Sequence, residues 1–346
     1  MLIIKLSAIG DVIHTLPFLE VIRRRYPEAA IDWLIEEDAG QIIEGHKELD
    51  RIIVSRRKSW QRAFLRSGKR METLRAIVEF VRELRAREYD LVIDIQGLLK
   101  SGLMTGLVKG KRKVGFSGGR EGSSIFLTER PFPVNYDQHA LDRYLQGARH
   151  LGCETNAWEG AIPIRESDKE SVNRLIRENG LQGKPLIAIN PMAKWETKLW
   201  DSKKFVVLAT RLQKELGCKI LFTGSGQDRP NLERIIGAMD TRAFNLAGQT
   251  TLKELAYLFS KCDLAVTTDT GPMHLAAAMG CPVVALFGPT SPLRTGPYGE
   301  GHVIVREELD CAPCFKKSCD HLSCMGNITV EKVFDAVSQV LTSKVR

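Results

Sequence analysis

The sequence of 346 residues has no long apolar run and no internal repeat or low-complexity tract. No stretch approaches the ~18 to 20 apolar residues needed to cross a bilayer, and Lys5 and Asp11 interrupt the first apolar segment. We therefore expect neither a signal peptide nor a transmembrane helix, and a cytoplasmic protein. With 43% hydrophobic and 27% charged residues, the chain is globular and long enough for two domains.

Glycine is scarce at the place where nucleotide-binding proteins usually have it. The run LIIKLS predicts a buried strand and AIGD a turn into a helix, but only Gly10 is present and Asp11 follows it. A nicotinamide dehydrogenase needs further glycines here and an acid about 20 residues later. That class is excluded. Pro17 leaves two alternatives: a helix that begins near Asp11 and kinks, or one that begins only at Pro17.

The net charge of +8 is concentrated in one segment. Between positions 51 and 87, three acids, Glu72, Glu79 and Glu83, stand against twelve basic residues: Arg51, Arg56, Arg57, Lys58, Arg62, Arg66, Lys69, Arg70, Arg75, Arg82, Arg85 and Arg87. Such an excess favours a polyanion or an anionic membrane surface as partner. From Met71 onward we prefer an ordinary solvated helix face. For SRRKSWQR we prefer anion binding, because its apolar residues are too few for a packed helix and Trp60 lies among its cations.

Strand-like and helical segments alternate along the chain. Strands are predicted at IDWLI (31), RIIV (51), YDLVIDI (89), PLIAIN (185), CKILFTG (218), DLAVTT (263) and PVVALFG (282). Amphipathic stretches such as METLRAIVEFVRELRAREY and SKKFVVLATRLQKELG separate them. This alternation predicts two α/β domains of parallel sheet, each covered by helices. Their ligands are then expected just after the strands.

The stretch TDTGPMH follows a predicted strand and starts a helix. Pro272 suits the first helical turn, and the N–H groups of Thr270 and Gly271 remain for an anion. Asp269 could instead be a simple helix cap, but a cap requires neither His274 nor the second Gly-Pro-Thr turn after the next strand. We therefore predict a phosphate or diphosphate site here.

A second loop, NPMAKWETKLW, follows the first strand of the second domain. Lys194 and Lys198 flank it, and a lysine at a strand end beside a helix start can neutralise a diphosphate leaving group. The alternative is a pair of solvent-exposed lysines.

The motifs KLSAIGDVIHTLP, IDWLIEE, YDLVIDIQGLLKS, TKLW and TDTGPMHLAAAMGCPVVALFGPT together resemble the family 9 glycosyltransferases, the ADP-heptose:lipopolysaccharide heptosyltransferases. The resemblance covers most of the chain and is greatest to the heptosyltransferase I branch. It implies a GT-B fold, in which two Rossmann-like domains face each other across a central cleft. We expect an acceptor domain at 1–165, a nucleotide-sugar domain at 166–328, and a C-terminal helix at 329–346 that packs back on the first domain.

The resemblance also implies roles for individual residues. Asp11 matches the catalytic base, Lys198 the diphosphate-binding lysine, and Asp269, Thr270, Gly271 and His274 the donor loop. We place Gly10 and Lys194 on the donor side as well. The implied reaction is an inverting transfer of heptose from ADP-L-glycero-D-manno-heptose to Kdo-lipid A, and it requires no metal cofactor.

The expected acceptor is an anionic glycolipid on the cytoplasmic face of the inner membrane, with which the protein associates peripherally. Arginine binds carboxylates and phosphates as a planar fork. The acceptor-binding candidates are therefore Arg56, Arg57, Lys58, Arg62 and Arg120.

The eight cysteines fall into two groups. Those at 153, 218, 262 and 281 are isolated beside apolar runs, as small core residues are. The others, Cys311, Cys314, Cys319 and Cys324, have the spacing C-x2-C-x4-C-x4-C, for which we consider a structural Zn²⁺ or a set of free thiols.

Three other functions compete with this assignment. Heptosyltransferases II and III, or another nucleotide-sugar transferase, share the motifs. A sugar-nucleotide epimerase shares the GT-B architecture but needs no acceptor. A nucleic-acid-binding protein would explain the basic segment and the cysteines but not the donor-like loop, so we expect no nucleic acid as partner.

Overall fold

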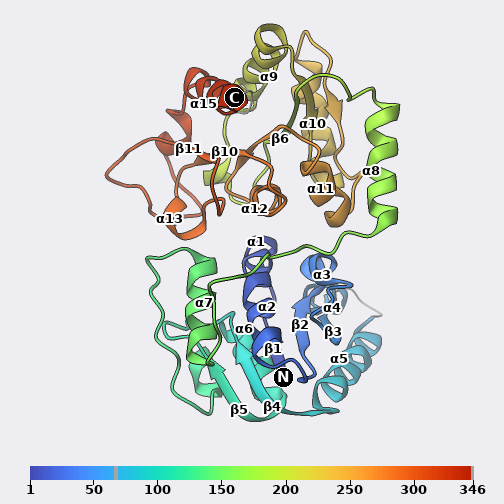
Figure 1. Cartoon of the computed structure of the whole chain (residues 1–346), viewed down its shortest axis with the longest axis vertical. Helices are drawn as coiled ribbons and strands as arrows, with labels where there is room; N and C mark the ends of the chain where they lie inside the picture. The colour runs from blue at the N-terminus through green and yellow to red at the C-terminus, as the bar shows by residue number, and fades with distance from the viewer. Residues whose placement is uncertain (66–68, 344–346) are drawn as a thin grey trace. The chain divides into compact units, whose positions relative to one another are not determined.

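The computed structural model describes residues 1–65 and 69–343, so Arg66 of the basic segment lies outside the described residues. The chain divides into two compact units, Met1–Pro163 and Ile164–Arg346 (Figure 1). The division falls two residues before the domain boundary expected from the sequence. Each unit is described by itself.

The first unit is built on a five-stranded parallel sheet with the strand order β3-β2-β1-β4-β5. Its strands are β1 Leu2–Ile4, β2 Asp32–Glu36, β3 Arg51–Ser55, β4 Glu88–Asp94 and β5 Lys109–Gly115. Its helices are α1 Ile9–Ile13, α2 Leu16–Arg25, α3 Glu37–Ile43, α4 Arg57–Phe64, α5 Arg70–Arg85, α6 Leu99–Leu107, the short η1 Ser123–Phe126, and α7 Ala140–His150. Helix α2 contacts α7, while α5 contacts both α4 and α6, so two groups of helices cover the sheet.

The second unit has a six-stranded parallel sheet with the order β11-β10-β9-β6-β7-β8. Its strands are β6 Leu186–Asn190, β7 Lys219–Phe222, β8 Phe244–Asn245, β9 Leu264–Thr268, β10 Val283–Phe287 and β11 Val303–Arg306. Its helices are α8 Glu166–Glu178, η2 Glu196–Lys198, α9 Ser202–Leu216, η3 Gly226–Asp228, α10 Arg229–Gly237, α11 Leu252–Phe259, α12 Gly271–Ala278, α13 Pro292–Thr295, α14 Ser323–Gly326 and α15 Val330–Ser343.

Both sheets are wound in two directions from a central strand. In the first unit the chain leaves β1 toward β2 and later returns to β4 on its other side; β6 lies in the same way between β7 and β9. Such a reversal opens a crevice outside the carboxyl ends of the two central strands, where ligands of α/β sheets bind. We therefore expect the site residues at the carboxyl ends of β1 and β4 in the first unit, and of β6 and β9 in the second.

The eight strands predicted from apolar runs, LIIKLS and the seven that follow it, are all present. Strands such as β2 and β9 are buried along their whole length, as parallel strands covered on both faces must be. Three strands were not predicted: β5, with the polar sequence KGKRKVG, β8, with two residues, and β11, with four. All three are edge strands, which bury less and so have a weaker apolar pattern.

The structure matches neither of the two alternatives for the helix near Pro17. The chain forms a single short turn of helix, α1, and then a second helix, α2, in which Pro17 lies in the first turn. Proline is favoured there because its missing N–H would have no partner inside the helix. Asp11 is therefore inside a helix that stops before Pro17.

The segment SRRKSWQR is a helix that packs, contrary to the sequence interpretation. It forms most of α4, which lies against α5. Trp60 faces this contact, with its ring 5.1 Å from that of Phe80, at the edge of the core of the first unit. One large aromatic ring is enough to anchor a helix of two turns.

Helix α15 belongs to the second unit by its packing. Phe334 and Val337 are buried in the core of that unit, and the helix contacts α9 and β11. Its expected packing on the first domain stays a prediction. The isolated cysteines Cys153, Cys218, Cys262 and Cys281 are buried, as predicted for small core residues.

No helix within residues 1–65 and 69–343 combines the length and apolar character needed to cross a bilayer.

Gly147 of α7 tests the packing of the first unit. A Cβ at this position would lie 2.0 Å from the ring of Phe116, which is 7% exposed. We expect Gly147→Ala to lower the free energy of unfolding by about 1–3 kcal/mol because the ring must shift within a packed core. Chemical denaturation measures this. The control is Gly237→Ala in α10, where a Cβ would have no neighbour within 4 Å; equal stability of both variants would contradict the prediction.

Candidate functional site

Asp11 lies just after β1 and is the third residue of α1. Its Oδ2 accepts the N–H of Ala8 over 3.1 Å, which satisfies a donor that the start of the helix leaves unpaired. The side chain keeps 36% of its surface exposed. The carboxylate therefore stabilises the turn while remaining accessible to a ligand. Its predecessor Gly10 is buried inside α1.

Two buried groups hold the other oxygen of Asp11. Lys5, at the end of β1, donates to the hydroxyl of Tyr144 over 2.8 Å, and this hydroxyl donates to Asp11 Oδ1 over 3.1 Å. The Lys5 ammonium is itself 3.8 Å from the carboxylate. Hydrogen bonds and a cation both favour an ionised carboxylate. The arrangement presents Asp11 as an oriented, charged base.

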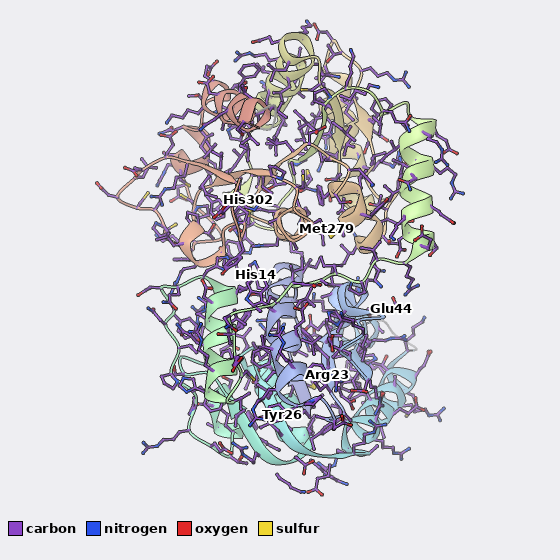
Figure 2. All side chains as sticks on the ribbon, in the orientation of Figure 1. His14, Arg23, Tyr26, Glu44, Met279 and His302 are labelled. Atoms are coloured by element: carbon purple, nitrogen blue, oxygen red, sulfur yellow. The ribbon has the colours of Figure 1, made fainter. Side chains whose placement is uncertain are left out.

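The environment shifts the pKa of both Lys5 and Tyr144. Burial lowers the pKa of Lys5, against the opposing effect of the Asp11 and Asp94 carboxylates. Burial, followed by the charge of Asp11, raises the pKa of the Tyr144 phenol well above its usual range, so the hydroxyl keeps its proton. His14, labelled in Figure 2, is the C-cap residue of α1. Its ring is 4.7 Å from that of His139 at the start of α7.

A second charged cluster forms around Glu36, at the end of β2. Arg57 donates to its Oε1 through Nε (3.2 Å) and Nη2 (3.0 Å), and Lys100 donates to the same oxygen over 3.3 Å. Lys58 is 3.4 Å from the other oxygen. Burial alone would raise the pKa of Glu36, but Arg57 and Lys100 outweigh it and hold that pKa below its usual range. Three cations therefore surround one buried carboxylate, and Asp38 pairs with one of them.

Lys100 joins this cluster to the turn of Asp11. Its ammonium donates to Ser7 Oγ over 2.5 Å as well as to Glu36. Burial lowers the pKa of Lys100, and Glu36 acts in the opposite direction. Neither Lys100 nor Glu36 was selected from the sequence, although Glu36 directly follows the predicted strand IDWLI, where ligands were expected; Lys100 lies in the first turn of the helix after β4.

The structure brings only some of the acceptor-binding candidates together. Arg57 and Lys58 belong to the Glu36 cluster, and Lys58 also pairs with Asp38 over 2.6 Å, which is the main reason that the pKa of Lys58 is raised. Arg56 is the exposed residue before α4, and Arg62 is exposed one turn further along that helix. Arg120 is exposed on a loop that its N–H attaches to the Gly97 carbonyl after β4.

In the second unit, three strand ends meet at Asp269. Lys198, from the loop after β6, donates to Asp269 Oδ2 over 2.6 Å and to its carbonyl over 3.1 Å. Thr290, from the turn after β10, donates to the same carboxylate oxygen over 2.6 Å. The Asp269 side chain is 5% exposed and that of Lys198 is 16% exposed. Asp269 is thus not a helix cap; it positions the lysine.

Helix α12 begins directly beside this lysine. Thr270 is its N-cap residue, Gly271 its first residue, and Pro272 lies in its first turn, as predicted. Such a helix start attracts an anion through its unpaired N–H groups. His274 is buried one turn into the helix. Lys194 is exposed on the preceding loop, away from any interaction that assigns it a role.

The cysteine motif lines a small cavity. Cys311, Cys314, Cys319, Cys324 and His321 border a space of about 50 Å³, and all eight cysteines are free thiols. Within residues 1–65 and 69–343, no group of three or more His, Cys, Asp or Glu side chains is placed to hold a metal ion. This finding contradicts the predicted structural Zn²⁺, because spacing along a chain does not fix the direction of the thiols.

Two doubly wound parallel sheets, with an accessible carboxylate in one and a lysine beside a helix start in the other, define a glycosyltransferase of the GT-B class. The family model of glycosyltransferase family 9 (heptosyltransferase) matches residues 77–324. The chain belongs to this family. The expected fold class and family resemblance are confirmed.

The chain is similar over most of its length to characterised members. It is 32% identical over 322 residues to lipopolysaccharide heptosyltransferase 1 of Pseudomonas aeruginosa, covering 92% of this chain and 87% of that protein. Its structure resembles the family 9 glycosyl transferase of Veillonella parvula (TM-score 0.83, 26% identity, 99% and 97% coverage). It also resembles the E. coli heptosyltransferase WaaC with ADP (TM-score 0.76, 26% identity, 98% and 99% coverage).

We expect the buried Lys5 ammonium beside Asp11 to lower the free energy of unfolding. Because folding lowers the pKa of Lys5, the unfolded chain binds more protons between that lowered pKa and about 10.4; the stability of the wild type therefore rises with pH in this window. We expect Lys5→Met to be as stable as the wild type or roughly 1–4 kcal/mol more stable at pH 7, since Asp11 stays solvated. The difference in the free energy of unfolding between Lys5→Met and the wild type should be smaller at pH 9.5.

Denaturant unfolding at the two pH values measures this effect. The control is Lys111→Met, which removes an exposed pair with Asp90 and should leave the free energy of unfolding nearly unchanged. A Lys5→Met variant that is strongly destabilised at pH 7 would show instead that the buried cation holds the fold together.

Proposed function

We propose that this chain transfers heptose from ADP-L-glycero-D-manno-heptose to the Kdo-lipid A inner core of lipopolysaccharide, with inversion at the anomeric carbon. The observation that carries the proposal is the accessible Asp11 carboxylate, held ionised by Ala8, Tyr144 and Lys5 at the switch point of the first sheet. Membership in family 9 and the similarity to heptosyltransferases 1 of several bacteria support the choice of donor and acceptor.

Asp11 removes the proton from an acceptor hydroxyl in this mechanism. Its Oδ2 accepts the Ala8 N–H and its Oδ1 accepts the Tyr144 hydroxyl, and 36% of the side chain stays exposed to an incoming hydroxyl. The deprotonated oxygen attacks the anomeric carbon from the face opposite the nucleotide, and the bond to the diphosphate breaks through an oxocarbenium-like state.

The second unit stabilises the departing ADP. Asp269, which accepts the Thr290 hydroxyl, holds Lys198 beside the first N–H groups of α12, which lie after Thr270. This cation and the helix start oppose the charge that develops on the diphosphate. His274 is a proposed donor contact on the resemblance; Gly10, at the turn after β1, and Lys194, on the loop after β6, are proposed donor contacts from their places in the sequence.

The Glu36 cluster is suited to the anionic acceptor. Glu36 orients Arg57, Lys58 and Lys100 next to Ser7, so that their remaining donors can bind a carboxylate or phosphate. Arg56, Arg62 and Arg120 extend the positive surface. Because the proposed acceptor is a lipid, we also propose peripheral association with the anionic cytoplasmic face of the inner membrane.

Mass measurement of the lipid after incubation with ADP-heptose and Kdo-lipid A tests the function directly. We expect addition of one heptose, whereas an epimerase would convert the donor without any glycolipid. A heptosyltransferase of type II or III would leave Kdo-lipid A unchanged and accept a core that already carries heptose.

Asp11→Asn should reduce turnover at least ~10²-fold, the loss expected when a general base is removed. Binding of ADP, measured by calorimetry, should stay within about twofold of the wild type, because the amide retains the size of the side chain. The matched control is Asp90→Asn, an exposed aspartate early in β4. Normal turnover in Asp11→Asn would refute the assignment of the base.

Transfer should continue in the presence of EDTA, because Lys198 and the start of α12 supply the positive charge that a metal provides in other transferases. The measurement compares initial rates with EDTA, without EDTA, and with added Mg²⁺ or Mn²⁺. Rates should agree within about twofold. Loss of activity in EDTA with recovery on addition of metal would contradict this mechanism.

A further inference from the structure

Exposed apolar side chains are concentrated in one part of the first unit. Of the twelve large hydrophobic residues that are exposed in the described chain, eight lie between positions 54 and 103. Three of them are on α5: Met71 is 65% exposed, Leu74 45% and Val78 47%. The sequence analysis favoured an ordinary solvated face for this helix, but three large apolar side chains are costly to leave in water.

These residues share one face of α5 with arginines. Helical positions three, four and seven apart lie on one side, so Met71, Leu74 and Val78 lie in a stripe with Arg75, Arg82 and Arg85. The opposite side contributes Phe80 and Leu84 to the core. The glutamates Glu72, Glu79 and Glu83 form a separate stripe at the side of the helix. The outward face therefore carries apolar and positively charged groups and no acid.

The neighbouring helix continues this surface. Helix α6 contacts α5, and Arg85 donates to the carbonyl of Leu107 at the end of α6. Leu99 and Leu103, one turn apart on α6, are 41% and 48% exposed. We name these five apolar residues with Arg75, Arg82 and Arg85 the α5–α6 face.

We propose that the α5–α6 face docks on an anionic lipid bilayer, the surface in which the proposed acceptor is embedded. The occupant is indicated by the mixture of residues. At a bilayer surface, apolar side chains enter the acyl boundary while arginines extend to the phosphates, and a face with arginines and no acid is complementary to anionic lipid. Among the described residues, Arg75 and Arg82 make no ion pair with a carboxylate, so both guanidinium groups can bind lipid phosphate.

The surface gives the proposed reaction a physical advantage. Membrane docking converts a search in three dimensions into a search within the lipid plane, and the affinity of several weak contacts accumulates. This inference rests on the proposed function for its biological purpose only. Docking itself is a property of α5 and α6 and can be measured without any sugar.

Co-sedimentation of the full-length protein with vesicles tests the proposal. The probe is a bilayer of phosphatidylethanolamine with 30% phosphatidylglycerol, compared with pure phosphatidylcholine, at low and high salt. We expect binding to the anionic vesicles that weakens with salt. Arg75→Gln with Arg82→Gln should lower the partition coefficient about tenfold or more. Val78→Gln should lower it severalfold.

The matched control is Val207→Gln on α9, since Val207 is 48% exposed and Val78 is 47% exposed. Equal loss in both valine variants, or undiminished binding in the arginine variant, would overturn the proposal. So would a wild-type dimer in sedimentation velocity that the α5 variants dissociate while vesicles remain unbound. The substituted positions are exposed, and circular dichroism checks that each variant is folded.

Activity separates this inference from the proposed function. The α5 variants should transfer heptose normally to a water-soluble, deacylated Kdo acceptor and slowly to the same acceptor in vesicles. A wild type that binds vesicles but transfers to neither acceptor would refute the proposed function and leave the docking surface intact. Normal transfer without any vesicle binding would refute the docking surface and leave the proposed function intact.

Discussion

A carboxylate at the end of a parallel strand has to be compensated, and both sites of this protein depend on how that is done. Asp11 and Asp269 each follow a strand at the centre of a sheet; Asp11 lies in the first turn of α1, and Asp269 lies just before α12. Asp11 obtains a backbone N–H, a phenol and a buried ammonium; Asp269 obtains Lys198 and Thr290. Without the Ala8 N–H and the Tyr144 phenol at Asp11, or without Lys198 and Thr290 at Asp269, the negative charge would destabilise its turn.

The two aspartates differ chiefly in exposure, and this difference separates their chemistry. Asp11 keeps 36% of its side chain exposed, so a substrate hydroxyl can reach it, while Asp269 keeps 5% and can only hold a neighbour in place. The same logic explains Glu36, which is buried and orients three cations. Buried acids thus position basic side chains, and the accessible acid is the one suited to proton transfer.

The sequence interpretation was wrong where it read a local pattern without its surroundings. The segment SRRKSWQR was expected not to form a packed helix, but its Trp60 packs on Phe80; its binding of an anion stays a prediction. The spacing of Cys311 to Cys324 suggested zinc, but the described residues offer no such group. Lys5, Tyr144 and Lys100 were missed because their meaning depends on partners 139, 133 and 93 positions away, and no alternation of apolar residues encodes such pairs.

The sequence by itself determined the two parallel sheets, eight of their strands, the helix start at Thr270 and the placing of Asp11 and Lys198 at strand ends. Periodicity and helix signals are local, and strand ends are where such sheets bind ligands. Only the tertiary structure decided which aspartate is accessible, which cations Glu36 has gathered, and that α5 turns apolar residues and arginines outward. These properties arise from burial and from contacts between distant segments, which exist only after the chain has folded.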